Sequence, residues 1–279
     1  MRRHLTVLAG LAMVLASCGS DQVEPFALVA SSNGSVGVGD DQRVMFALID
    51  PETDQFLTSP DRAATVTIRD ENGSPLDTYP MEFVWTIPDV RGLYVARVEI
   101  PEAATYQATI DAEGLATAGP VGFVAFDDSP LIQPGDEAPA SETRTSAQFP
   151  DLSIITSDPE PDPAMYQLSV AEAVSDGTPA VIVFATPAFC TSRACGPLLD
   201  QVKALRPDYP GVDFVHVEIY EDLQVSSPDE LTVVPATAEW GLPSEPWVFV
   251  VDASGVVSAS FEGAASDAEL VAAIDAVAP

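Results

Sequence analysis

Positively charged residues are scarce in this chain. Eleven lysine and arginine residues stand against forty-three aspartate and glutamate residues, and Lys203 is the only lysine. The formal net charge is −32 at pH 7. A surface this acidic repels the phosphates of nucleic acids and of anionic lipid head groups. The composition therefore excludes nucleic acid as a partner, and it fits an adaptation for solubility or salt better than an acidic recognition site.

Long apolar runs are also missing, apart from one near the start of the chain. Residues 5–15 form an eleven-residue, predominantly apolar stretch, too short to span a bilayer, and they follow a basic Arg2-Arg3-His4 segment. The run ends in Leu15-Ala16-Ser17-Cys18-Gly19, which resembles the lipobox of bacterial lipoproteins. The resemblance implies that residues 1–18 are a lipoprotein signal peptide, cleaved before a lipid-modified Cys18. It also implies an exported protein anchored to the outer face of the cytoplasmic membrane. An ordinary secretory signal is the alternative.

Cysteine and histidine are both rare. The three cysteines are Cys18, Cys190 and Cys195, and outside the leader His216 is the only histidine. If lipid occupies Cys18, Cys190 and Cys195 remain as a pair in an oxidising compartment, where a disulfide can persist.

The two remaining cysteines follow a short apolar run. Residues 181–184 (VIVF) predict a buried strand, and a helical pattern begins after Gly196-Pro197. A thiol at a helix N-terminus ionises readily, because the unpaired N–H groups carry partial positive charge. Four residues separate Cys190 from Cys195, so the pair can meet only if that loop bulges and regular helix starts near Gly196.

Residues 26–126 have the pattern of an all-β domain. Apolar and polar residues alternate in short runs rich in β-branched and aromatic residues, and turn signals such as Asn72-Gly73 separate them. The predicted strands are 43–49, 64–68, 82–87, 93–100, 106–110 and 121–126. We therefore expect residues 19–127 to form a β-sandwich, and residues 92–108 resemble the closing strands of bacterial immunoglobulin-like domains.

A proline-rich acidic stretch divides the chain. Residues 128–164 have little periodicity and are predicted to be a linker. Residues 165–279 then alternate helix with strand, which predicts a mixed sheet with helices on both faces. The expected elements are a helix at 169–175, strands at 180–184, 212–219, 247–251 and 256–261, and a last helix capped by Ser266.

This second half resembles the thioredoxin fold, of the thioredoxin/peroxiredoxin superfamily. Two segments carry the resemblance: FATPAFCTSRACGP, and WGLPSEPWVF followed by DASG. The resemblance implies that Cys190 is an exposed nucleophile, Cys195 resolves the mixed disulfide, and Pro246 is a cis proline facing both. Arg193 and Thr191 are possible supporting residues, and the reading calls for no cofactor and no metal. Residues 134–139 resemble the lead-in to such domains, which leaves a domain start near 134 open.

Four functions are compatible with this reading. The leading prediction is a membrane-anchored thiol–disulfide oxidoreductase acting on the thiols and disulfides of exported proteins. A peroxidase would use Thr186-Pro187 and Thr191 beside Cys195. A copper chaperone would add His216 to the two thiols. The alternative from another class is a non-catalytic binding or scaffold lipoprotein in which the cysteines form a structural disulfide. The pattern favours an enzyme and leaves the scaffold open.

Overall fold

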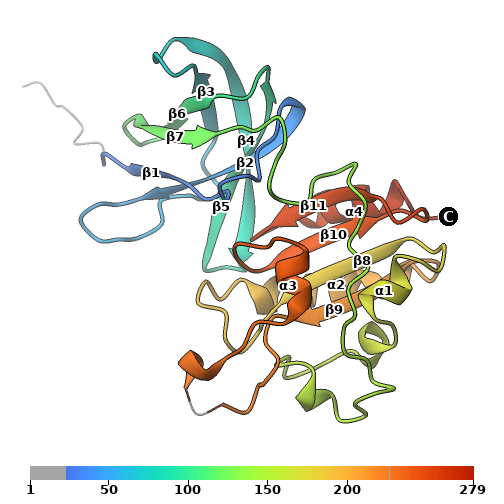
Figure 1. Ribbon diagram of the computed structural model, residues 1–279. Helices are drawn as coiled ribbons and strands as arrows, with labels where there is room; N and C mark the ends of the chain where they lie inside the picture. The colour runs from blue at the N-terminus through green and yellow to red at the C-terminus, as the bar shows by residue number, and fades with distance from the viewer. Residues whose placement is uncertain (1–22, 226) are drawn as a thin grey trace, which may run out of the picture.

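The computed structural model describes residues 23–225 and 227–279 of the chain. The predicted signal peptide and the lipid-modified Cys18 lie outside the described residues. Figure 1 shows two β-sheets, with a few short helices around the second. Within the described residues, no helix has both the length and the apolar character that crossing a membrane requires.

The first sheet contains seven antiparallel strands in the order β1-β2-β5-β4-β3-β6-β7. Neighbouring strands are consecutive in the chain or joined by hairpins, apart from the β2–β5 and β3–β6 pairs. The strands are β1 (Phe26–Val29), β2 (Gly39–Ile49), β3 (Ala64–Arg69), β4 (Pro75–Ile87), β5 (Arg91–Ile100), β6 (Thr105–Ala112) and β7 (Ala118–Val124). All six predicted strands in this half are confirmed.

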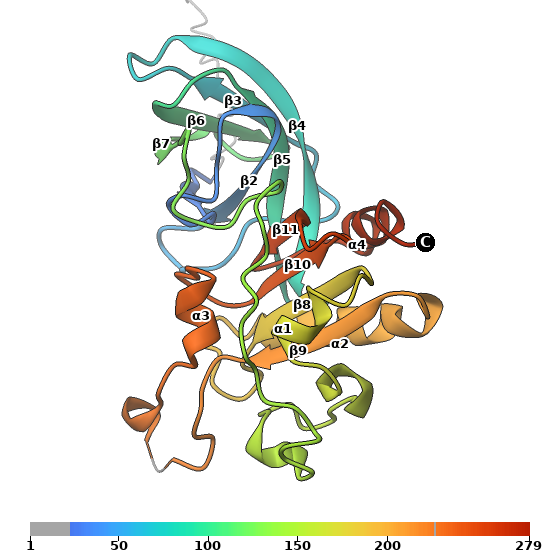
Figure 2. The same cartoon turned by 45° about the vertical axis from the view of Figure 1, so that its right-hand side comes forward.

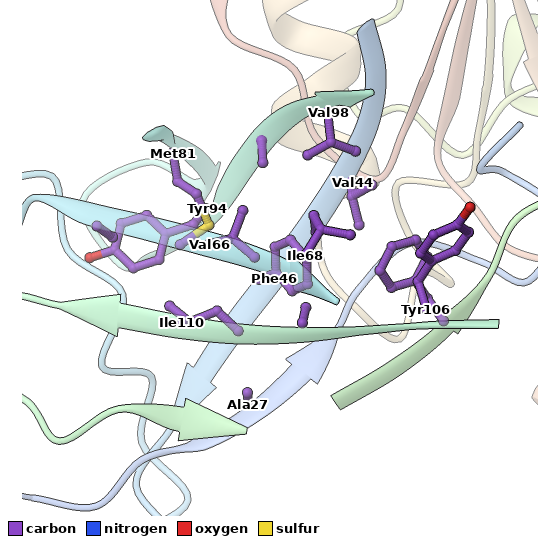
Figure 3. Packing of buried hydrophobic residues seen from close by; sticks show 14 of the residues in the cluster. Ala27, Val44, Phe46, Val66, Ile68, Met81, Tyr94, Val98, Tyr106 and Ile110 are labelled. Carbon is purple, nitrogen blue, oxygen red and sulfur yellow. The ribbon is translucent and has the colours of Figure 1, made fainter. Parts of the chain in front are cut away.

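The alternation of side chains explains the core of this sheet. In β3 and β6 every second residue is buried, which places one face of each strand inside the curve of the sheet. Figure 3 shows this packing, with Phe46, Tyr94 and Ile110 among the labelled residues. The Tyr106 and Phe123 rings stack at a centroid distance of 5.7 Å.

The predicted immunoglobulin-like sandwich is wrong. The strands form one sheet that curls until its ends approach each other, not two sheets packed face to face. The Ala116 amide donates to the Val23 carbonyl at 3.0 Å, and a parallel bridge joins Gly37 to Phe126. The alternation of apolar and polar residues shows which face of each strand is buried. It does not show whether the buried faces belong to one curled sheet or to two packed sheets, so the sequence pattern fits both arrangements.

The second sheet contains four strands in the order β11-β10-β8-β9. Only β8 and β9 are parallel, and β10 is antiparallel to both of its neighbours. The strands are β8 (Ala180–Ala185), β9 (Asp213–Glu218), β10 (Trp247–Val251) and β11 (Val257–Glu262). The α-helices are α1 (Val170–Ala173), α2 (Cys195–Leu205), α3 (Pro235–Glu239) and α4 (Asp267–Asp275). Four 3₁₀ turns are η1 (Leu152–Ile154), η2 (Pro163–Tyr166), η3 (Arg206–Asp208) and η4 (Pro228–Glu230).

Every residue of β8 and β10 is buried, so both faces of this sheet are covered. One face packs on Leu198 and Val202 of α2 and on Ile274 of α4. The other packs on the Trp240 ring, whose centroid lies 4.6 Å from that of Phe249.

The two sheets are joined by polar and apolar contacts. Arg43 on β2 forms an ion pair with Glu269 on α4 at 2.8 Å, and both side chains are largely buried. The Ser32 amide and hydroxyl donate to Glu262 on β11. Figure 2 shows the long β4–β5 pair extending from the first sheet to the second. There Val84 packs with Ala264 in a small apolar cluster.

The predicted separate α/β domain with a thioredoxin-like fold is also wrong. The described chain is a β-rich fold of eleven strands with four short α-helices, of which α1 has four residues and α3 five. The individual strands and helix starts predicted for residues 165–279 are confirmed, including the Ser266 cap of α4. The predicted class overestimated the helical content, because brief apolar periodicity does not distinguish one helical turn from a full helix.

Candidate functional site

The two cysteines lie on the turn that connects β8 to α2. The Cys190 amide donates to the Thr186 carbonyl at 3.0 Å, and the Arg193 amide donates to the Cys190 carbonyl at 3.1 Å. These bonds make the loop bulge, and α2 begins at Cys195. The helix therefore starts within one residue of the predicted position, and the turn brings the two cysteines together as the sequence spacing required.

Both cysteines are free thiols in a buried corner. Cys195 is fully buried, and Cys190 is 8% exposed. The two sulfurs and a carboxylate oxygen of Glu245 all lie within 4.8 Å of one another. The Cys190 sulfur also lies 3.1 Å from the Ser192 hydroxyl. The corner is thus a compact group of three potentially anionic side chains.

The environment separates the acidities of the two thiols. The hydrogen bond from the Cys195 thiol, together with those from Ser192 and the Cys195 and Ala194 amides, outweighs burial and lowers the pKa of Cys190 to about 5. The same bond to Cys190, followed by burial, raises the pKa of Cys195 well above its ordinary value. Burial, then the charges of Cys190 and Glu218, raises the pKa of Glu245. Cys190 is therefore the thiolate of the pair at neutral pH.

We expect the alkylation of Cys190 by iodoacetamide to show this pKa. In a Cys18→Ser chain, the rate should rise with pH to a half-maximum near 5, because only the thiolate reacts. Cys195→Ala removes the main stabilising bond and should move the midpoint upward. A midpoint between 8 and 9 in the chain that retains Cys195 would contradict the assignment.

The other predicted site residues lie around this corner. The Glu245–Pro246 peptide bond is cis, as predicted for Pro246. Arg193 has a positive φ of 60° and an exposed side chain. Neither its guanidinium nor the exposed Thr191 hydroxyl forms a hydrogen bond or ion pair with a described residue.

His216 does not join the cysteines. It is buried on β9, where Nδ1 lies 2.7 Å from the Tyr166 hydroxyl and Nε2 lies 3.1 Å from the Ala185 carbonyl. Because a carbonyl only accepts, Nε2 donates and Nδ1 accepts. Both ring nitrogens are occupied by protein partners, which argues against the copper site that combined His216 with the thiols.

Glu245 is the site residue that the sequence analysis missed. It lies fifty residues beyond Cys195, directly before the strand β10. Its position next to a proline that opens a strand was the available signal. Within the part of the chain that the structure describes, its carboxylate has no hydrogen bond and no ion pair.

A second feature lies beside the cysteine loop. The β4–β5 turn reaches this loop, where the Arg91 guanidinium donates to the Ser192 carbonyl. A groove of about 480 Å³ separates the β4–β5 hairpin from α2 and the segment leading into α4. Its lining residues include Phe83, Trp85 and Leu198, and also Thr86, whose buried hydroxyl has no hydrogen-bond partner. This groove was not predicted.

Comparisons with known proteins give only weak similarities. No family model matches the chain, and no curated protein matches it. A filamin domain of Lin-41 is 13% identical, with 37% of this chain and 93% of that one covered and a TM-score of 0.23. A conjugative transposon lipoprotein from Bacteroides eggerthii is 12% identical. The match covers 37% of this chain and 97% of that chain, with a TM-score of 0.20. A lipoprotein from Bacteroides thetaiotaomicron is 9% identical. The match covers 45% of this chain and 86% of that chain, with a TM-score of 0.19. At these scores the similarities establish no relationship.

The predicted membership of the thioredoxin/peroxiredoxin superfamily is therefore corrected. No family model supports it, and the described fold is β-rich. The redox activity was inferred from that membership and loses its main support with it. The prediction also required an exposed nucleophile, whereas Cys190 is almost covered.

Proposed function

We propose that this protein is a non-catalytic binding lipoprotein that holds an exported protein at the outer face of the cytoplasmic membrane. The leader pattern that ends at Cys18 supports the lipid anchor. The groove beside the β4–β5 hairpin supports the binding role and is the observation on which the proposal depends.

An exposed apolar side chain lines this groove, and another lies on the turn beyond it. Trp85 in the groove is 40% exposed, and Val90 at the β4–β5 turn, outside the groove lining, is 72% exposed. Exposed apolar groups that gather at one place mark interaction sites, and tryptophan is enriched among the residues that dominate binding energies. The Trp85 ring packs edge-on against Phe83 with centroids 4.8 Å apart, which holds it in place before a partner arrives.

The charges around the groove indicate the chemistry of the partner segment. Asp200 and Asp267 both line the groove. Lys203 pairs with Asp200, but the chain as a whole has a large excess of negative charge. A segment with an apolar side chain flanked by lysine or arginine would complement this site and associate faster at low salt.

The junction of the sheets supports binding by keeping the groove walls fixed. One wall belongs to the first sheet and the other to α2 and α4, and the Arg43–Glu269 ion pair links the two parts. A preformed site avoids part of the ordering cost of association.

Partner capture with matched variants tests this proposal. Exported proteins retained by the anchored chain are identified, and their affinities are measured with purified components. Trp85→Ser should weaken binding by about 30-fold, the effect of losing about 2 kcal/mol at a dominant residue. Leu76→Ser is the control, because Leu76 lies on the same strand, is 49% exposed, and is not a groove residue. Equal losses in both variants, or none in Trp85→Ser, would refute the proposal.

A further inference from the structure

We propose that Cys190, Cys195 and Glu245 form a binding site for a zinc ion. This proposal goes beyond the partner-binding function and does not depend on it, since the groove and this corner use different side chains.

Geometry provides the first argument. Three separate parts of the chain bring their ligand atoms together: the turn after β8, the first residue of α2, and the residue before Pro246. Their ligand atoms all lie within 4.8 Å of one another. A tetrahedral zinc ion with Zn–S bonds of about 2.3 Å holds its sulfur ligands roughly 3.8 Å apart. The observed separations of at most 4.8 Å are therefore of the size that three ligands of one ion require.

The lack of a neutralising partner provides the second argument. Glu245 is partly buried, and its carboxylate has no hydrogen bond or ion pair with any described residue. Neither cysteine is in a disulfide. Among the described residues, 23–225 and 227–279, no lysine or arginine forms a hydrogen bond or ion pair with Cys190, Cys195 or Glu245. The three donors therefore have no cation of the protein's own, and an ion bound between them would balance their charge once they ionise.

The donor set selects the ion. Two thiolates and one carboxylate match zinc, which accepts both sulfur and oxygen. Magnesium and calcium prefer oxygen donors alone, whereas copper(I) prefers sulfur. On coordination the Cys195 thiol releases its proton to water, whereas Cys190 coordinates as the thiolate that it already is at neutral pH. Three protein ligands leave a fourth position for water or an external ligand.

Access to the corner also favours an ion over a larger reactant. Cys190 alone of the two cysteines reaches the surface, and it is nearly covered. The acidic surface of the protein raises the local concentration of divalent cations. The sequence pattern suggested His216 as the third metal ligand and not Glu245, because Glu245 is distant in the chain and glutamate is common.

Cobalt(II) is the probe, because its absorption reports both sulfur ligation and coordination number. The full chain with Cys18→Ser, kept reduced, should bind one Co²⁺ with sulfur-to-cobalt charge-transfer absorption and the strong visible bands of four-coordination. Zinc should displace it. Cys190→Ser and Cys195→Ser should each weaken binding by at least 100-fold, and Glu245→Gln by at least tenfold.

Glu218→Gln is the matched control. Glu218 is a buried acid whose negative charge contributes to the raised pKa of Glu245. It accepts hydrogen bonds from Ser157 and does not belong to the group formed by Cys190, Cys195 and Glu245. Its replacement should leave cobalt affinity within about threefold. An equal loss in Glu218→Gln and Glu245→Gln would show general attraction by negative charge and overturn the assignment of Glu245 as a ligand.

If Cys195→Ser does not fold, because Cys195 is buried, thermal unfolding of the parent chain and of Cys190→Ser still tests the proposal. Zinc should raise the melting temperature of the parent chain and leave that of Cys190→Ser unchanged, because a ligand stabilises only the state that binds it. Absence of charge-transfer absorption, binding that survives Cys190→Ser, or a Cys190–Cys195 disulfide formed in the presence of excess zinc would each overturn the proposal.

Discussion

Glu269→Ala should destabilise the folded protein by about 3–5 kcal/mol, the cost of leaving a buried charge without its partner. Glu269 accepts bonds from Arg43 Nε at 2.8 Å and from Arg97 Nη2 at 3.0 Å. It also accepts a bond from the Ser266 amide, which caps α4. The substitution would leave the Arg43 guanidinium largely buried and unpaired by a carboxylate at the junction of the sheets. Urea-induced unfolding measures the loss.

The control for this substitution is Glu172→Ala. Glu172 occupies the same third position in the capping box of α1, with Ser169 as the cap, but no arginine among the described residues forms a hydrogen bond or ion pair with it. Its removal should cost much less than the removal of Glu269. Similar losses in the two variants would mean that capping, and not the ion pair between the sheets, accounts for the effect.

The pH dependence of stability should report the same ion pair. Burial alone would raise the pKa of Glu269, but the bonds and charge of Arg43 outweigh it and lower the pKa to about 2 from its ordinary value of 4.5. Because the folded-state pKa is the lower one, the stabilisation is complete above about pH 4.5 and is lost as the pH falls toward 2. Its size is about 3 kcal/mol. Glu269→Ala should therefore show a shallower decline of stability across this pH range than the parent chain.

Trp240→Ala is the second substitution with a large expected effect, a loss of about 3–5 kcal/mol in the free energy of unfolding. Trp240 is fully buried, and its ring lies 5.2 Å from that of Phe184 and 4.6 Å from that of Phe249. Removing the indole would leave a cavity between the second sheet and the end of α3. Denaturant unfolding followed by far-UV circular dichroism measures the loss without relying on tryptophan fluorescence.

Trp240→Phe provides the comparison. The indole N–H of Trp240 is buried without a hydrogen-bond partner, so phenylalanine removes an unpaired polar group while keeping most of the apolar volume. This variant should lose far less stability than Trp240→Ala. A loss below about 1 kcal/mol in Trp240→Ala would contradict the packing described for this face of the sheet.

The sequence predicted local elements well because each depends on neighbouring residues. Alternating apolar residues located the strands around Phe46 and Tyr106, and Ser266 with Glu269 located the start of α4. The turn holding Cys190 and Cys195 was predicted from the strand before it and the proline after it. These signals lie within a few residues of the structures that they specify.

Arrangements that depend on distant residues were not predictable in the same way. Alternation did not reveal that the first seven strands curl into one sheet, nor that Arg43 reaches Glu269 across 226 positions. Glu245 joins the cysteines only because β10 lies beside β8. The family resemblance was misleading because it depended on two short motifs, one around a turn and one around a proline, and these do not specify how distant strands and helices are arranged.

The most direct test of the binding proposal is the affinity of a captured partner for the Cys190→Ser/Cys195→Ala chain. A non-catalytic binding protein that uses the groove at Trp85 should retain its affinity within about threefold when both thiols are removed, provided that the variant is folded. Loss of binding in this variant, with binding preserved in Trp85→Ser, would contradict the account and place the partner at the cysteine corner.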